Sequence, residues 1–226
     1  MSENTTTPTS SGGLMDRIQD YVRTNRKWLT IGGGALVVLV GGYIYYQKQY
    51  VAPKNKKAQD QLWKADYYFE IDSFKLAANG DAAGMPGYKM VTKKYGSTSG
   101  GNLASYCLGI CYLNTGDYKN ALKSLEDCSF DDDLVGSIAI GSQGDALMEL
   151  NKVNDAIEKY EEAANRNEND FTTPLYLKKA AFGYEQKGQY KKAAEIYERI
   201  FRDFEHTTEG RDIEKYLARA KNLGGK

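Results

Sequence analysis

The feature that most constrains the fold is an internal repeat of 35 to 37 residues. The small residue Gly109 has a counterpart 35 positions later at Gly144, and another 37 positions after that at Ala181. In each copy an alanine follows the small residue after 12 positions, at Ala121, Ala156 and Ala193. Repeats of this length indicate stacked supersecondary units. Small residues at fixed spacing fit two helices that cross closely, because larger side chains would push the backbones apart.

Turn-forming residues divide each copy into two helices. Gly116, Asn151 and Gly188 occupy equivalent breaks, where a left-handed residue can end the first helix. The resulting helix–turn–helix unit resembles the tetratricopeptide repeat (TPR) over residues 102–205, although the signature tryptophan and the closing proline are absent from these copies. The resemblance implies an all-α helical solenoid with three clear repeats.

Further helical sequence lies at both ends of the repeats. A divergent fourth copy spans residues 58–101, and the stretch NGDAAGMPG over residues 79–87 interrupts its second helix, which resumes over residues 88–95. At the other end, residues 206–226 are predicted to form a capping helix and tail. A solenoid needs such a terminal helix, with a polar outer face, to cover its last repeat. The inner face of the cap is predicted to contain Ile213, Tyr216, Leu217 and Ala220.

One segment is long and apolar enough to cross a membrane. Residues 28–46, WLTIGGGALVVLVGGYIYY, contain no charge. As a helix they would extend about 28 Å, close to the ~30 Å hydrocarbon core of a bilayer, with Trp28 at one interface. We predict an uncleaved transmembrane helix, in which Gly34 and Gly41 share one face and contact another helix in lipid. The alternatives are a buried soluble helix and a cleaved signal peptide.

Three short segments flank the predicted span. Residues 1–13 are polar and lack apolar periodicity, so we expect them to be disordered. Residues 14–27 form a juxtamembrane segment, and residues 47–57 form a basic connector to the repeats. Four basic residues precede the span and four follow it, so the positive-inside rule favours neither orientation.

The order of these segments suggests a second resemblance. A short tail, one span, a lysine-rich connector and a TPR domain over residues 15–223 resemble the ancillary subunit of the bacterial SecYEG translocon. The resemblance implies an inner-membrane protein with a cytoplasmic N-terminus and a periplasmic TPR domain. It also implies that the partners are SecYEG translocon subunits or a periplasmic chaperone.

No group of reactive side chains points to an enzyme. His206 is the only histidine, so it cannot form a His–His metal site. Cys107 and Cys111 lack CxxC spacing, and with Cys128 they are predicted to be small buried hydrophobic residues. The 30 basic and 30 acidic residues leave no net charge to attract nucleic acid. We therefore expect a protein-interaction module without a cofactor, a metal or a small-molecule substrate.

The TPR resemblance also predicts a binding groove. In TPR proteins one stripe of each first helix lines the concave face. Transferred to this chain, the stripe contains Leu62, Asp66, Phe69, Leu103, Tyr106, Ile110, Leu113, Ile138, Asp145, Met148, Leu175, Lys178, Phe182 and Glu185. Such a groove would take an apolar helix or an extended peptide, and its charged side chains would set the register. The alternative is that the short superhelix covers this stripe itself.

Three functions are compatible with this sequence. The first is a membrane-tethered scaffold beside the translocon, which binds a partner protein or an exported chain. The second is a TPR adaptor that faces the cytoplasm. The third is an assembly factor of the cell envelope or of cell division. They share one fold and differ in topology and partner.

Overall fold

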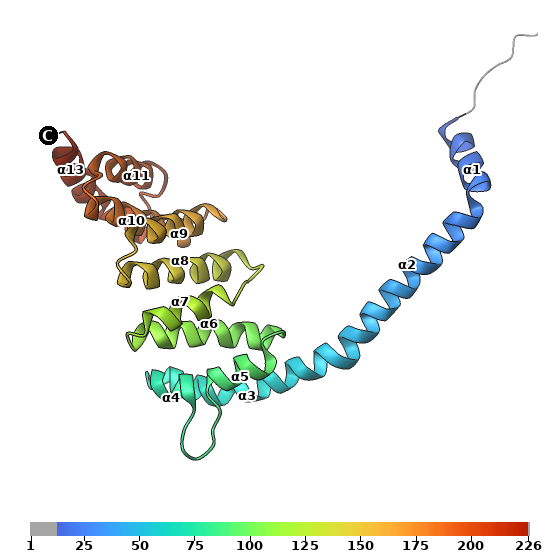
Figure 1. The fold of residues 1–226 in the computed structure, drawn as a ribbon. Coiled ribbons are helices and arrows are strands. Elements are labelled where there is room, and N and C mark those ends of the chain that lie inside the picture. The colour runs from blue at the N-terminus through green and yellow to red at the C-terminus, as the bar shows by residue number, and fades with distance from the viewer. Residues whose placement is uncertain (1–12, 226) are drawn as a thin grey trace, which may run out of the picture. The chain divides into compact units, whose positions relative to one another are not determined.

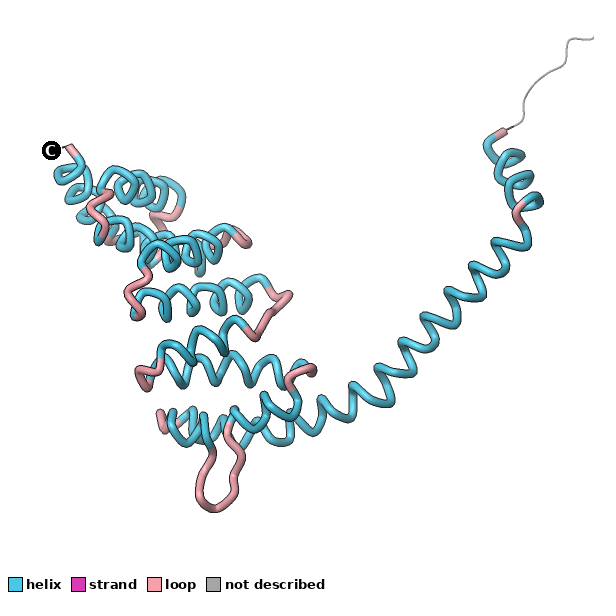
Figure 2. Tube along the Cα trace, in the orientation of Figure 1, coloured by secondary structure: helices cyan, strands magenta, loops and turns pink. Residues whose placement is uncertain are grey.

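The computed structural model describes residues 13–225, which form helices and loops without a strand (Figures 1 and 2). The predicted all-α class is therefore confirmed for this range. The chain divides into two compact units, Met1–Pro53 and Lys54–Lys226. The tail predicted to be disordered over residues 1–13 lies, apart from Gly13, outside the described residues.

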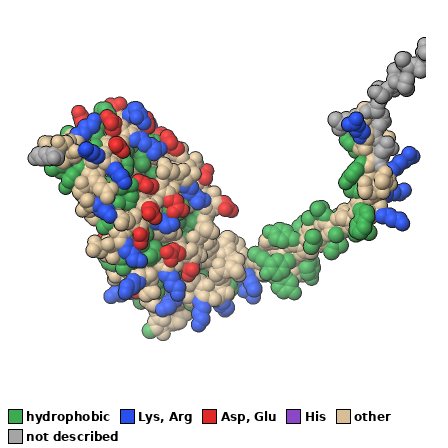
Figure 3. All heavy atoms as spheres, turned by 45° about the horizontal axis from the view of Figure 1, so that its top comes forward, with side chains coloured by type: hydrophobic (Ala, Val, Ile, Leu, Met, Phe, Trp, Pro, Cys, Tyr) green, Lys and Arg blue, Asp and Glu red, His purple; other side chains and the backbone are tan. Residues whose placement is uncertain are grey.

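The first unit is helical, and its longest helix is apolar. It contains α1 (Leu14–Thr24), α2 (Arg26–Tyr46) and η1 (Gln47–Val51). One helix, which starts at Arg26, is long and apolar enough to cross a membrane, and none of its apolar window is buried. Hydrophobic side chains cover the visible surface of α2 (Figure 3). A Cβ atom added at Gly34 or Gly41 would meet no atom within 4 Å, so their contact with another helix stays a prediction.

The basic connector predicted over residues 47–57 is helical. It begins with the π-helical turns of η1 and continues into α3 (Ala52–Glu70), which extends past residue 57. Pro53 accounts for the wide turns. It has no N–H to donate, and its ring crowds the carbonyl four residues earlier, so the helix widens locally instead of ending.

The second unit is a succession of helix pairs (Figure 1). At its N-terminal end, α3 packs with α4 (Phe74–Asn79) and α5 (Tyr88–Tyr95). Three further pairs are α6 (Ser99–Asn114) with α7 (Tyr118–Glu126), α8 (Asp133–Glu149) with α9 (Val153–Asn165), and α10 (Thr172–Gln186) with α11 (Tyr190–Asp203). The short α12 (Thr208–Arg211) leads into the C-terminal helix α13 (Ile213–Gly224). From α6 to α11 each helix contacts the next.

The predicted turn residues end the first helix of each of these three pairs. Gly116, Asn151 and Gly188 have φ values of 78°, 58° and 69°, in the left-handed region. Gly116 and Gly188 adopt it without the steric cost of a Cβ atom, and asparagine tolerates it better than most residues do. The side chain of Asp117 then accepts a hydrogen bond from a backbone N–H in the first turn of α7.

The predicted small residues lie where the two helices of a pair cross. A Cβ atom at Gly109 would lie 2.6 Å from Cγ of Leu125 on α7, and one at Gly144 would lie 2.6 Å from Cε1 of Tyr160 on α9. Both distances are shorter than real Cβ contacts. Ala181 takes the equivalent place in the third pair and is fully buried. The repeat read from the sequence therefore reflects close helix packing.

Buried side chains form two core clusters. One joins α3, α4, α5 and α6 and includes Leu62, Tyr88 and Val91. The other extends from α8 to α13 and includes Tyr197 and Phe204. The C-terminal helix contributes three buried side chains to the second cluster, Ile213, Leu217 and Ala220. Helix α13 therefore packs against the last pair.

A loop separates the two short helices that follow α3. Helix α4 ends at Asn79 and α5 begins at Tyr88, with a projecting loop between them (Figure 2). The loop residue Asp81 accepts two hydrogen bonds: Oη of Tyr68 on α3 donates to its Oδ2 at 2.5 Å, and N of Met85 in the loop donates to its Oδ1 at 2.8 Å. The Tyr68 hydrogen bond is the largest cause that lowers the pKa of Asp81. A charged carboxylate thus holds the loop to α3.

The Gly144 crossing can be tested by overpacking. Gly144→Leu is expected to destabilise the second unit by on the order of 1–3 kcal/mol or more, because the added side chain must displace the Tyr160 ring. The measurement is the Tm of the purified chain in detergent, followed by circular dichroism. Gln186→Leu, at an exposed position of α10, is the control and should leave Tm nearly unchanged. An unchanged Tm for Gly144→Leu would contradict the close crossing.

Candidate protein-binding face

The first helices of successive pairs form one face of the second unit. Helix α8 contacts α6 on one side and α10 on the other. Residues at equivalent positions of these helices therefore follow one another across the face. Leu103, Ile138 and Leu175 form one equivalent set, and Leu134 and Phe171 form another set four residues earlier. We call this surface the first-helix face.

The N-terminal ends of these helices carry exposed apolar side chains. Leu103, Leu134, Ile138 and Phe171 are between 37% and 77% exposed, and Leu175 is half-buried. We call these five residues the apolar edge. Three of them, Leu103, Ile138 and Leu175, belong to the groove predicted from the sequence. Their exposure fits a surface that a partner could cover.

Hydrogen bonds fix the backbone that presents Phe171. Oδ1 of Asn169 accepts from the backbone N–H groups of Phe171 and Thr172, at 2.9 and 2.8 Å. Oγ1 of Thr173 accepts from N of Asn169 and donates to the carbonyl of Ala164. The most exposed aromatic side chain of the second unit therefore stands on an ordered turn. A side chain held in this way loses less entropy when a partner binds.

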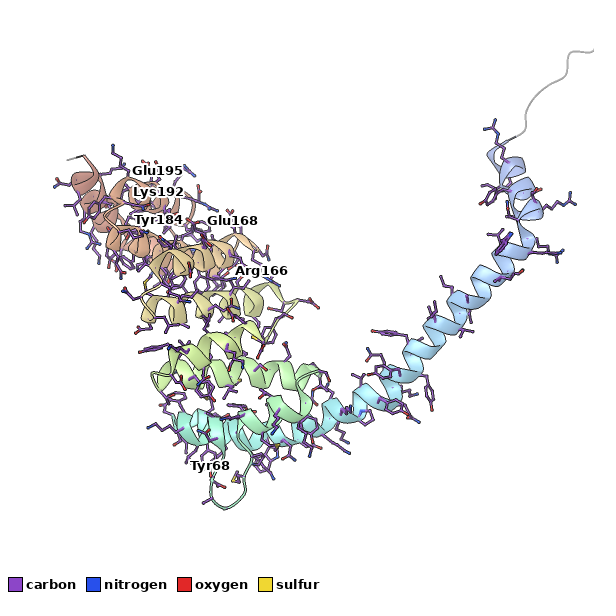
Figure 4. The ribbon with its side chains drawn as sticks, in the orientation of Figure 1. Tyr68, Arg166, Glu168, Tyr184, Lys192 and Glu195 are labelled. Carbon is purple, nitrogen blue, oxygen red and sulfur yellow. The ribbon has the colours of Figure 1, made fainter. Side chains whose placement is uncertain are left out.

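Arg166 and Glu168, labelled in Figure 4, anchor the loop before Phe171 through polar contacts. Nη2 of Arg166 donates to the carbonyl of Phe130, in the loop between α7 and α8. Nη2 of Arg199 on α11 donates to Oε2 of Glu168 at 3.0 Å. These contacts connect the loop to the preceding and the following pair.

The chain itself covers the C-terminal end of the first-helix face. Tyr216 on α13 packs edge-to-face against Phe182 at a centroid distance of 5.3 Å, and Nζ of Lys178 lies 5.4 Å from the Tyr216 ring centroid. Arg219 on α13 forms an ion pair with Glu185, whose side chain is only 12% exposed. Three predicted groove residues are therefore engaged by the capping helix and do not form an open groove.

Asp145 is engaged within the chain as well. Its Oδ1 accepts from Oη of Tyr160 at 2.8 Å and from Nζ of Lys179 at 2.6 Å. The same Nζ lies 5.6 Å from the ring centroids of Tyr160 and Tyr176. This network joins α8, α9 and α10. Asp145 and Glu185 would have to leave these partners before they could set the register of a peptide.

The part of the predicted groove on α3 is also largely closed. Leu62 is only 4% exposed and belongs to the first core cluster, so its assignment to the groove was wrong. It faces inward because α3 packs that side against the following helices. Oδ1 of Asp66 accepts from Oη of Tyr88 at 2.5 Å, and Phe69 packs edge-to-face against Phe74 and Tyr88.

The side chains in the middle of the first-helix face are partly buried. Tyr106 packs edge-to-face against Phe130 at 5.9 Å, and its burial raises the pKa of its hydroxyl. Ile110, Leu113 and Met148 are half-buried. These side chains therefore contribute to the packing of the first-helix face, and the apolar edge remains its most exposed apolar part.

Sequence reasoning missed Leu134 and Phe171. Leu134 lies one helical turn before Ile138, so it shares a face with a residue that was predicted. Phe171 lies 37 positions after Leu134, the same interval that separates Ile138 from Leu175. The repeat itself could have identified both residues, if the stripe had been extended one turn towards the helix starts.

Metal-binding side chains do not cluster in the described part of the chain. No group of three or more His, Cys, Asp or Glu side chains there could hold a metal ion. His206 is exposed, and its Nε2 lies 3.1 Å from Oδ2 of Asp170. Cys107, Cys111 and Cys128 are free thiols, two of them buried and Cys107 half-buried. Burial of Cys111 and Cys128 agrees with the prediction that the cysteines act as small hydrophobic residues in the core, and Cys107 is partly buried.

Comparisons with known proteins do not identify a relative. No protein-family model matches the chain, and no curated protein matches it. The assignment of function therefore depends on the sequence and the structure of the chain itself.

The cysteines should react slowly in the folded chain. Burial raises the pKa of Cys107 and Cys111 to about 12 and that of Cys128 to about 11. A raised pKa leaves less thiolate at a given pH, so alkylation at pH 8 should be roughly 100-fold slower than in the denatured chain, and faster as the pH rises. Mass spectrometry after timed iodoacetamide labelling measures this rate. Equal rates in the folded and denatured chains would contradict the buried positions.

Proposed function

We propose that this chain is a TPR scaffold that is anchored in a membrane by α2 and binds a protein partner through its first-helix face. The repeated helix pairs, the left-handed turns and the small residues at the crossings support the TPR assignment. No reaction is assigned to the chain. Its role is to hold another protein at a membrane.

The anchor is supported by the surface of α2. The helix contains no charge from Trp28 to Tyr46, and its side chains are exposed along this length. In water such a surface would carry a large hydrophobic cost, whereas in a bilayer it matches its surroundings. Within the proposal, Gly34 and Gly41 contact another transmembrane helix.

The single observation that carries the binding proposal is the apolar edge. Its exposed side chains lie at equivalent positions of adjacent first helices, and Phe171 is held on an ordered turn. A row of apolar side chains across several helices fits a partner segment that is itself apolar, either an amphipathic helix or an extended peptide. The engaged charges at Asp145 and Glu185 leave shape and hydrophobic contact as the main determinants of recognition.

The proposed setting is the periplasmic side of a bacterial inner membrane, beside the SecYEG translocon. This setting follows from the resemblance in segment order. A translocon subunit, a periplasmic chaperone or an exported chain would present the apolar segment. A cytoplasm-facing adaptor and an envelope or division assembly factor would use the same surface with a different topology or partner.

Binding through the apolar edge is tested with a double variant. Leu134→Ser with Ile138→Ser is expected to weaken co-purification of the partner at least about tenfold, because two central apolar contacts are lost. Both side chains are exposed, so Tm should change little. Phe201→Ser, an equally exposed apolar residue on α11, is the matched control and should bind normally. Unchanged recovery of translocon subunits by the double variant would contradict this site.

Topology is tested separately from binding. The proposal predicts that a C-terminal reporter is active in the periplasm, and that protease added to spheroplasts digests the second unit. The flanking charges are equal, so this experiment decides between the scaffold and the cytoplasm-facing adaptor. Protection of the C-terminus from external protease would exclude the periplasmic setting.

A further inference from the structure

The N-terminal end of the second unit carries a row of exposed apolar side chains. Trp63, Tyr67 and Ile71 are spaced by four residues along α3 and just beyond its end, and are 60%, 54% and 54% exposed. The spacing places them on one side of the helix. We call them the α3 ridge. With Phe171, they are the most exposed large apolar side chains of the second unit.

The ridge lies opposite the packed side of α3. Ala58, Leu62 and Ala65 are buried against the following helices. Helix α3 therefore has one covered face and one apolar face without a neighbour in the described chain. A terminal helix of a helical stack needs a polar outer face or a partner.

The other end of the stack is built differently. Helix α13 buries Ile213 and Leu217 and exposes charged side chains such as Glu214 and Lys215. That end can face water. Leu223 is the one large hydrophobic side chain exposed on α13, beside the charged side chains, so a head-to-tail contact between copies would pair an aromatic row mainly with a charged surface. The asymmetry leaves the ridge to pair with a surface like itself.

Charges around the ridge are balanced. Lys56, Asp60, Lys64 and Glu70 are the charged residues of α3 within about 60° of the centre of the ridge around the helix axis, at 100° per residue. Nζ of Lys64 lies 5.8 Å from the Trp63 ring centroid. None of the four forms an ion pair with another side chain in the described residues. Two positive and two negative charges beside one apolar row are self-complementary.

We propose that the α3 ridge is a contact between two copies of this chain. In a two-fold contact the same surface meets itself, so the apolar rows cover each other and each copy supplies both signs of charge to the other. A lipid surface fits less well, because Asp60 and Glu70 would be repelled by anionic head groups. The inference concerns the end of the stack and is independent of partner binding at the apolar edge.

The first test measures the mass of the full chain in detergent. Sedimentation should give a dimer, and Trp63→Ser with Tyr67→Ser should raise its dissociation constant about 30-fold or more, since buried aromatic anchors dominate such contacts. Phe171→Ser, at a similarly exposed aromatic residue, is the control and should keep the dimer. A monomeric wild-type chain, or a double variant that remains as dimeric as the wild type, would overturn the proposal.

The second test uses charge. Asp60→Lys with Glu70→Lys makes the surroundings of the ridge uniformly positive, so two copies should repel each other and the dimer should weaken at least tenfold at low salt. Contact with an anionic lipid surface would instead become stronger. An unchanged or stronger self-association would overturn the proposed pairing.

The third test locates the contact directly. Tyr67→Cys in the full chain should form a disulfide-linked dimer under mild oxidation, whereas Phe171→Cys should not. The native cysteines contribute little, because their thiols are largely buried and the pKa of each is raised. Equal cross-linking at both positions, or none at residue 67, would overturn the assignment.

Discussion

The close crossing of two helices within each pair is the constraint on which the second unit depends. At Gly109 and Gly144 the backbone of the first helix lies against Leu125 and the Tyr160 ring, where a Cβ atom would not fit. This approach allows large side chains of the second helix to reach across the pair. It also sets the distance at which the next pair can pack. The rest of the stack follows from repeating that geometry.

Repetition turns single positions into a surface. Residues 35 or 37 positions apart fall on adjacent first helices, so exposed leucine, isoleucine and phenylalanine side chains collect in the apolar edge. The same repetition does not keep the whole face open. Near the C-terminus, Tyr216 and Arg219 of α13 engage Phe182 and Glu185. In the proposed function, this leaves the starts of the first helices as the binding surface.

Each terminal helix of the stack needs a polar outer face or a partner, and the two ends differ in how they meet this need. Both terminal helices bury one side, but α13 exposes charge and α3 exposes the ridge of Trp63, Tyr67 and Ile71. Uncovered aromatic surface in water is unfavourable by roughly 25 cal/mol per Å² of apolar area. The C-terminal helix completes the fold alone, whereas the N-terminal helix is completed by a second copy in the arrangement proposed above.

The sequence by itself determined the helical class, the pairing of helices and the interruption after Asn79, because periodicity and turn residues are local properties of the chain. It also determined that α2 is apolar enough to cross a membrane. Tertiary structure decided which side of each helix stays exposed. Leu62 is buried in the first core cluster, because the following helices pack against its side of α3. Asp145 and Glu185 pair within the chain, because helices distant in sequence supply Lys179 and Arg219. Exposure depends on those neighbours, and a helical stripe alone does not specify them.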